Sequence, residues 1–226
     1  EKRAFYELIK DANIKAKNVY VVDKAVADGL GMDIDVKTSQ GVLVVNIGYD
    51  TTEISILSLG GIVVSKLIKI GGKNFDEAIK QAVRKEHKLV IGSKTSEKVK
   101  YAIYDMETTG KNAVVYGRDI VSGLPVEKAV SVDLVYDCLR EMFMTIVDNV
   151  KVILERTPPE LGADIYRNGI FLSGGASQID YFAQMLENET GLTVNVDEEP
   201  MATVIKGIST IIKEQKYNSL AYSIDA

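Results

Sequence analysis

The sequence of 226 residues contains no tryptophan, one cysteine and one histidine. A single cysteine, Cys138, excludes an internal disulfide bond and a zinc site built from cysteines. A single histidine, His87, excludes a metal site rich in histidine. No uninterrupted apolar segment approaches the roughly 18 residues of a membrane-spanning helix. The chain begins with charged residues and not with a signal peptide, so we expect a cytoplasmic protein.

Positive charge is in slight deficit, with 27 Lys and Arg residues against 32 Asp and Glu residues and a net charge of −5. A general nucleic-acid binder would present a basic face, so we expect no nucleic-acid partner. Apolar residues make up 46% of the chain, which is enough to form a hydrophobic core. The length suits one large domain or two small ones. These properties predict an acidic α/β protein.

Three apolar segments close together predict a meander of strands over residues 41–47, 51–59 and 62–70. Gly60-Gly61 is a typical two-residue hairpin turn between the last two strands. After Gly72 the apolar residues recur with the period of a helix. The remaining predicted elements are helices over 1–12, 24–32, 95–104, 133–156, 178–190 and 200–213, and strands over 18–22, 111–117, 125–132, 169–174 and 192–196.

The boundaries of the long helix and of the tail rest on particular residues. Asp133 is the predicted N-cap of the long helix, and Pro158-Pro159 ends it. Residues 33–40 are polar and predict a linker. The polar tail 214–226 is expected to be loose.

Two glycine-containing turns follow predicted strands, one near Gly48 and one at Gly174-Gly175. Each turn alone is more often an ordinary connection, but two such turns at strand ends can direct backbone N–H groups at one anion. Glu97 and Lys100 are spaced i,i+3 on a predicted helix. They face one side and can contact a ribose and an adenine edge, although such a pair alone is more often a surface ion pair.

Four segments, taken in order, resemble the MreB family of bacterial actins. Residues 44–79 resemble its second phosphate loop, typically D-I-G-G-G-T-T-E, and the meander that ends in F-D-E-A-I. Residues 96–100 resemble its nucleotide-contacting E-R-I-K, residues 158–161 its P-P-E-L, and residues 172–177 its adenosine loop L-T-G-G-G-A. The resemblance covers essentially residues 1–213.

The resemblance implies the α/β fold of actin-like ATPases, a mixed sheet of the ribonuclease H type flanked by helices, in two lobes around ATP. The first lobe is largely absent from this chain. Residues 1–38 would complete that lobe and the connecting helix, and residues 39–73 and 131–198 would form the sheet subdomain of the second lobe. Residues 74–130 would be the small inserted subdomain. Residues 199–213 would be a helix returning to the first lobe, followed by the tail.

The resemblance also implies a set of residues around ATP or ADP and Mg²⁺. The expected nucleotide contacts are Gly48, Tyr49, Asp50, Thr51, Thr52, Glu97, Lys98, Val99, Lys100, Gly174, Gly175, Ala176 and Ser177.

Departures from the family pattern bear on metal binding and hydrolysis. Asn46 stands where the family has an Asp that helps to hold Mg²⁺ through water, so we expect weak metal binding. Tyr49 and Asp50 replace two glycines. Lys24 is matched to the Glu that orients the attacking water, and a protonated lysine cannot accept that hydrogen bond. Losing such a group costs about 10²–10⁴ in rate, so hydrolysis is expected to be slow although Thr51 is present. Lys24 is instead free to pair with the γ-phosphate or with Asp50.

The leading interpretation is therefore an actin-like cytoskeletal protein that binds ATP and polymerises into filaments for cell shape or an internal motility skeleton. Its expected partners are further copies of itself, MreB-type paralogues and, through parts outside this chain, the membrane. Two alternatives stay open at this point. The first is a small-molecule kinase with the actin fold, and the second is a filament scaffold that binds no nucleotide.

Overall fold

The computed structural model describes residues 2–12 and 18–223, and its centre is a mixed sheet of five strands. In spatial order the strands are β4 (Gly61–Ile68), β3 (Thr52–Ser58), β2 (Val42–Ile47), β8 (Ile170–Ser173) and β9 (Val194–Val196). The strands β2, β3 and β4 form the predicted antiparallel meander, and β8 and β9 run parallel to β2.

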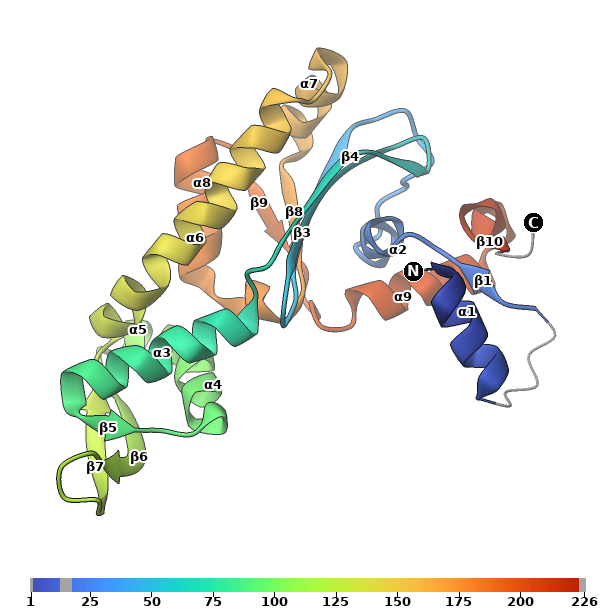
Figure 1. The fold of residues 1–226 in the computed structure, drawn as a ribbon. Coiled ribbons are helices and arrows are strands. Elements are labelled where there is room, and N and C mark those ends of the chain that lie inside the picture. Colours follow the sequence, from blue (N-terminus) through green and yellow to red (C-terminus); the bar gives the residue numbers. More distant parts are fainter. Residues whose placement is uncertain (1, 13–17, 224–226) are drawn as a thin grey trace.

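Every residue of β2 is buried because helices cover both faces of the sheet (Figure 1). Side chains alternate along a strand, so Leu43 and Val45 point to one face and Val42 and Val44 to the other. The helices α6 (Val132–Glu155) and α8 (Asp180–Thr190) cover the first face. The helix α2 (Lys24–Gly31) covers the second face and packs on α9 (Thr203–Lys213).

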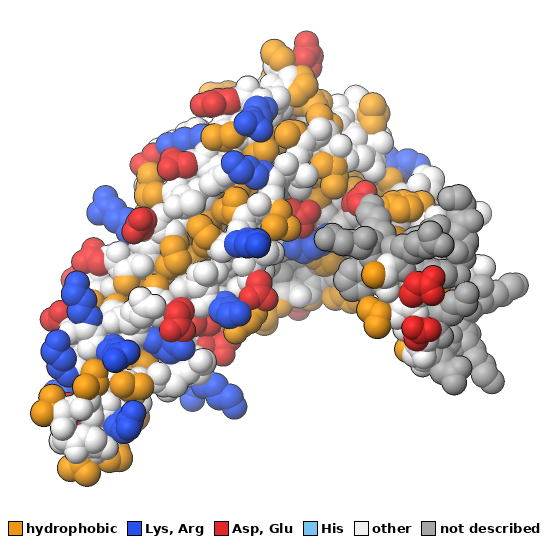
Figure 2. Space-filling view, viewed as in Figure 1, with side chains coloured by type: hydrophobic (Ala, Val, Ile, Leu, Met, Phe, Trp, Pro, Cys, Tyr) orange, Lys and Arg blue, Asp and Glu red, His pale blue; other side chains and the backbone are white. Residues whose placement is uncertain are grey.

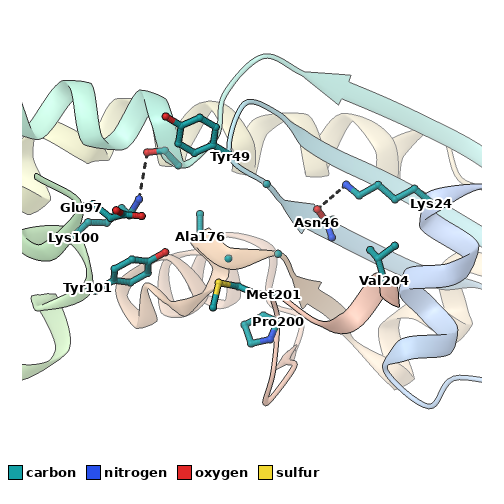
Figure 3. A pocket seen from close by; sticks show the side chains of 14 residues that line it. Lys24, Asn46, Tyr49, Glu97, Lys100, Tyr101, Ala176, Pro200, Met201 and Val204 are labelled. Atoms are coloured by element: carbon teal, nitrogen blue, oxygen red, sulfur yellow. Dashed lines mark hydrogen bonds between the residues drawn. The ribbon is translucent and has the colours of Figure 1, made fainter. Parts of the chain in front are cut away.

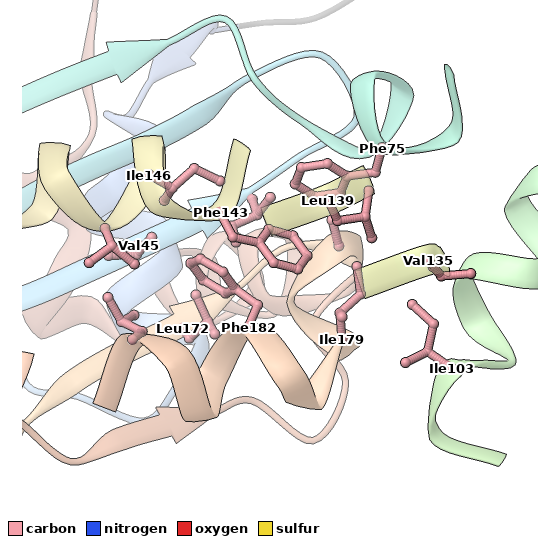
Figure 4. Close-up of a cluster of buried hydrophobic side chains, with 14 of the residues drawn as sticks. Val45, Phe75, Ile103, Val135, Leu139, Phe143, Ile146, Leu172, Ile179 and Phe182 are labelled. Carbon is pink, nitrogen blue, oxygen red and sulfur yellow. The ribbon is translucent and has the colours of Figure 1, made fainter. Parts of the chain in front are cut away.

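The helix α3 (Gly72–His87) extends the first core away from the sheet. The ring of Phe143 on α6 lies 5.1 Å from that of Phe75 on α3, edge to face, and 5.2 Å from that of Phe182 on α8 (Figure 4). All three rings are fully buried. Such aromatic pairs add about 0.5–1.5 kcal/mol beyond the burial of their area. This cluster therefore fixes the start of α3 beside the sheet.

A second sheet lies at the far end of α3 and is formed within residues 74–130. Its strands are β5 (Leu89–Val90), β6 (Ala113–Asp119) and β7 (Pro125–Val130). The segment predicted as one helix over 95–104 is instead α4 (Ser93–Tyr101) followed by α5 (Ile103–Thr109). The helix α4 packs against α3 and thereby faces the end of the central sheet.

The helices α2 and α9 cross at glycines. A Cβ atom added at Gly207 would lie 1.7 Å from the carbonyl oxygen of Ala27, and one at Gly31 would lie 1.9 Å from that of Thr203. Only glycine permits backbones to approach this closely. The crossing therefore holds α2 against the sheet, near the end at which the inner strands β2 and β8 stop.

Two local details differ from the prediction. The N-cap of α6 is Ser131, whose Oγ accepts a hydrogen bond from the N–H of Leu134 at 3.3 Å, so the prediction of Asp133 was wrong. The β3–β4 turn is made by Leu59 and Gly60, with φ of 52° and 77°, and not by Gly60-Gly61. Positive φ at both positions is the geometry of a type I′ turn, whose twist matches that of its two strands.

Residues 215–223 of the tail form defined structure where a loose tail was expected, and residues 224–226 lie outside the described residues. A 3₁₀ helix (Gln215–Leu220) buries Tyr217, and β10 (Tyr222–Ser223) pairs with β1 (Tyr20–Val21). The prediction also missed α7 (Pro159–Asn168), which begins at Pro159, a position where proline is favourable because no N–H is needed there. The helix α1 (Lys2–Asp11) agrees with the predicted helix. Within residues 2–12 and 18–223, no helix is both long and apolar enough to cross a bilayer.

Candidate functional site

A cavity of about 420 Å³ lies at the end of the sheet where β2 and β8 stop and α2, α3, α4 and α9 approach (Figure 3). Its lining comes from residues far apart in the sequence: Lys24, Asn46, Gly48, Tyr49, Gly72, Glu97, Lys100, Tyr101, Gly174, Gly175, Ala176, Pro200, Met201 and Val204. The carboxyl ends of parallel strands are the usual place for a ligand in an open α/β sheet.

The β2–β3 turn forms one wall, and α3 holds it in place. The N–H of Gly48 donates to the carbonyl of Thr51 at 2.9 Å, which closes the turn. The carbonyls of Gly48 and Tyr49 accept hydrogen bonds from the N–H groups of Gly72 and Lys73 at 2.9 and 2.8 Å. The turn thus packs on the N-terminus of α3. The partial positive charge of a helix N-terminus favours an anion nearby.

The turn after β8 lies beside the first turn because β8 pairs with β2 in parallel, with Ser173 opposite Asn46. Gly174 has φ of 84°, and a Cβ atom there would lie 2.3 Å from the carbonyl oxygen of Ile47. The Oγ of Ser177 donates to the carbonyl of Gly174 at 2.7 Å and closes this second turn. The two glycine turns therefore lie side by side and line one cavity.

The α4 side of the cavity carries an ion pair. Lys100 Nζ lies 2.8 Å from Asp76 Oδ1, and the Lys100 side chain is 3% exposed. Burial raises the pKa of the Asp76 carboxyl, and its hydrogen bond and charge attraction to Lys100 oppose that rise. Glu97 and Tyr101 line the same wall, one turn apart on α4. Burial also raises the pKa of the Tyr101 hydroxyl.

The α2 side carries a chain of polar contacts instead. Lys24 Nζ donates to Asn46 Oδ1 at 2.8 Å and lies 3.4 Å from Glu53 Oε2. Asn46 Nδ2 donates to Asp28 Oδ2 at 2.9 Å, and Ser173 Oγ donates to the same oxygen at 2.6 Å. Burial raises the pKa of Asp28, which is completely buried, against the opposing effect of these two hydrogen bonds. Asn46 therefore bridges a lysine at the cavity and an aspartate beneath it.

The residues expected at the site divide into two groups. Nine line the cavity: Lys24, Asn46, Gly48, Tyr49, Glu97, Lys100, Gly174, Gly175 and Ala176. The other six are not among the lining residues: Asp50, Thr51, Thr52, Lys98, Val99 and Ser177.

Several of the second group have other partners. Thr52 is fully buried and its Oγ1 donates to the carbonyl of Ile70 at 2.8 Å. Val99 belongs to the hydrophobic core, and Lys98 faces β6. Asp50 is exposed and lies 3.4 Å from Lys73 Nζ, so the expectation that Lys24 would be free to pair with it was wrong.

Sequence reasoning missed Gly72, Tyr101, Pro200, Met201 and Val204 in the lining, and Asp28 beneath it. One signal could have found Tyr101, because it follows Glu97 by four positions and therefore lies on the same helical face. The contributions of Met201 and Val204 depend on how α9 turns back to the sheet, which no local pattern reveals.

The residues present do not fit a divalent cation on the α2 side. Mg²⁺ prefers carboxylate and water oxygens in octahedral geometry. The side-chain oxygen of Asn46 already accepts a hydrogen bond from the Lys24 ammonium, and its nitrogen faces Asp28. Among the described residues, no group of three or more His, Cys, Asp or Glu side chains is placed to hold a metal ion.

Comparison with known proteins agrees with this geometry. The family model described as MreB/Mbl protein matches residues 1–219. The cell shape-determining protein Mbl of Bacillus subtilis is 37% identical over 208 residues, which cover 90% of this chain and 62% of Mbl. The cell shape-determining protein MreB of Escherichia coli K12 is 35% identical over 210 residues, which cover 92% of this chain and 60% of MreB. The chain thus spans about three fifths of the length of these relatives.

Solved structures show the same relation. Crystal structures of MreB5 of Spiroplasma citri bound to AMPPNP and to ADP are each 35% identical, with TM-scores of 0.87 and 0.88. Each alignment covers 97% of this chain, and 66% and 67% of the two MreB5 chains. The MamK double helical filament, at 22% identity and a TM-score of 0.73, shares the fold. The predicted actin-like fold is confirmed, and the chain belongs to the MreB/Mbl family.

Proposed function

We propose that this chain supplies the nucleotide-facing part of an actin-like cytoskeletal protein that binds ATP or ADP and polymerises into filaments. The observation that carries the proposal is the meeting of two glycine turns and the Glu97–Lys100 face of α4 at one cavity. The volume of about 420 Å³ lies within the usual range of small-molecule sites. The two MreB5 crystal structures add support, because one is bound to AMPPNP and the other to ADP.

The two halves of the cavity suit the two halves of a nucleotide. On the α4 side, Glu97 can accept hydrogen bonds from ribose hydroxyls, while Ala176 and Met201 offer apolar contact to a base (Figure 3). On the α2 side, the Gly48–Tyr49 turn and the Lys24 ammonium suit phosphate oxygens.

Equilibrium binding of a fluorescent ATP analogue to the purified protein tests this assignment. Glu97→Ala should weaken binding about tenfold, because a hydrogen bond to a charged group contributes about 1.5–3 kcal/mol. Glu141→Ala on the exposed face of α6 is the matched control and should bind as the wild type does. A wild type that binds no nucleotide would favour the scaffold alternative. Equal effects of the two substitutions would contradict the assignment of Glu97.

We further propose that hydrolysis is slow, since the α2 side of the cavity presents an ammonium group rather than a hydrogen-bond acceptor for water. Lys24→Glu should raise phosphate release at saturating ATP by about tenfold or more, with Lys73→Glu, an exposed lysine outside the lining, as the control. A variant no faster than the wild type would show that Lys24 is not the cause of slow turnover. A turnover that rises on adding a sugar or an acid would favour the kinase alternative.

Self-association is the proposed basis of filament formation. Large apolar side chains are exposed on the β6–β7 hairpin, at the lower left in Figure 2: Tyr116 within β6 is 69% exposed, and Val121 and Leu124 in the loop are 86% and 63% exposed. Exposed apolar patches of this kind commonly mark contact surfaces. Electron microscopy with and without ATP should show filaments, and Val121→Asp should reduce them.

Cell shape or an internal motility skeleton is the proposed role, in the cytoplasm and with contact to the membrane through parts outside this chain. MreB-type paralogues are proposed as further partners. Co-sedimentation with anionic vesicles, and with purified paralogues, tests the two kinds of contact separately.

A further inference from the structure

We propose that the Lys24 ammonium supplies the positive charge that a divalent cation would otherwise bring to the phosphates, so that nucleotide binding needs little Mg²⁺. The inference rests on the proposed nucleotide binding and concerns the same cavity. The α2 side of the cavity does not suit a divalent cation, because the side-chain oxygen of Asn46 accepts a hydrogen bond from the Lys24 ammonium.

The position of Lys24 is set by contacts at both ends of its side chain. Lys24 is the first residue of α2, and its Nζ reaches across to Asn46 at the end of β2, as the dashed line in Figure 3 shows. An ammonium group has three donors. One donates to Asn46 Oδ1 and a second faces Glu53 Oε2 at 3.4 Å. The third is available to a phosphate oxygen in the cavity that Lys24 lines.

Asn46 suits this arrangement because an amide both donates and accepts. Its nitrogen donates to the buried Asp28 and its oxygen accepts from Lys24, so the orientation of the amide is fixed. A carboxylate at position 46 would face the Asp28 carboxylate across a hydrogen-bond distance and repel it. The aspartate on α2 and the asparagine on β2 therefore form a matched pair, and that pair leaves Lys24 as the cation facing the cavity on this side.

Of the other lysines near the cavity, Lys100 is held in a buried ion pair and Lys73 lies outside the lining. Lys100 is 3% exposed and paired with Asp76 at 2.8 Å. Lys73 lies 3.4 Å from Asp50 and is not among the lining residues. Lys24 is 43% exposed, and its partner Glu53 is 20% exposed. An incoming phosphate can therefore reach Lys24 without breaking a buried ion pair.

The test compares the affinity for a fluorescent ADP analogue in excess Mg²⁺ and in excess EDTA. The wild type should change by less than about threefold between the two conditions. Lys24→Met should lose about tenfold in EDTA and clearly less in Mg²⁺, because the metal can then replace the missing charge. Lys24→Arg should keep binding in EDTA. Lys73→Met is the matched control, an exposed lysine that follows the lining residue Gly72 but lies outside the lining, and should follow the wild type.

The outcomes separate this inference from the proposed function. Wild-type binding that disappears in EDTA overturns the inference and leaves nucleotide binding intact. No binding in either condition overturns both. An equal loss for Lys24→Met in Mg²⁺ and in EDTA also overturns the inference, because Lys24 would then shape the site without replacing the cation. Thermal unfolding of each variant identifies a loss that comes from misfolding.

Discussion

The two sides of the cavity each combine a lysine with a buried aspartate, but they connect the two residues differently. On the α4 side the Lys100 ammonium lies directly on Asp76, with side-chain exposures of 3% and 11%. On the α2 side Asn46 lies between Lys24 and Asp28, and the Lys24 side chain is 43% exposed.

This difference predicts that Lys100 stabilises the fold and that Lys24 contacts a ligand. Two buried charges lose their hydration, and only their mutual attraction compensates for that loss. Removing one of them therefore leaves an uncompensated buried charge and destabilises the folded protein. A lysine at the surface retains its water and can exchange partners at little cost. We therefore expect Lys100 to keep its ion pair with Asp76, and Lys24 to form a new contact when a ligand enters the cavity. The four variants that follow break or sharpen this contrast.

Lys100→Met should have the largest effect on stability. It leaves the Asp76 carboxylate buried without its cation, which we expect to lower the free energy of unfolding by about 3 kcal/mol. Urea unfolding followed by circular dichroism measures the loss. The double variant Lys100→Met/Asp76→Asn should recover part of it. A double variant no more stable than the single one would show that the unpaired charge is not the cause.

Asn46→Asp should have the next largest effect. The new carboxylate would stand against Asp28 Oδ2, where Asn46 Nδ2 now donates at 2.9 Å. We expect a loss of about 2 kcal/mol at neutral pH, since one hydrogen bond becomes a repulsion. The exchanged pair Asn46→Asp/Asp28→Asn should regain most of this stability in the same unfolding measurement. If the exchange regains nothing, the two positions are not coupled.

Asp28→Asn should change the dependence of stability on pH. Burial raises the pKa of Asp28 above its ordinary 3.8, so the folded state binds the proton more tightly than the unfolded chain does. The stabilisation from protonated Asp28 is present below pH 3.8 and is lost as pH rises through the higher folded pKa.

Stability of the wild type relative to Asp28→Asn should therefore fall across that window, by about 1.4 kcal/mol for each unit of pKa difference. Unfolding of both proteins at a series of pH values measures the change. A relative stability that rises with pH would show that the hydrogen bonds to Asp28 outweigh its burial.

Lys24→Met should have the smallest effect on stability, less than about 1 kcal/mol, because its ion pair with Glu53 is partly exposed. Lys73→Met is the control, and both variants should unfold close to the wild type. A loss from Lys24→Met comparable with that from Lys100→Met would remove the distinction between the two lysines.

The sequence alone predicted much of the fold and nine of the fourteen residues that line the cavity. The continuous apolar segment that became β2 indicated a strand buried on both faces, and the glycines after β2 and β8 marked the turns. These features are local, because side-chain period and the conformational freedom of glycine depend on neighbours in the chain. The spacing of Glu97 and Lys100 was equally local, and both side chains line the cavity.

The tertiary structure decided which polar side chains meet. Asp28, Asn46 and Ser173 come from α2, β2 and β8, and the last is 145 positions from the first. Their contacts follow from the parallel register of β2 with β8 and from the glycine crossing that holds α2 against α9. Local pattern predicts a residue's element and face, whereas the partner of a buried polar group is set by elements that pack only after the chain has folded. For this reason Asn46 could be recognised as a departure from its family, but its role as a bridge between Lys24 and Asp28 could not.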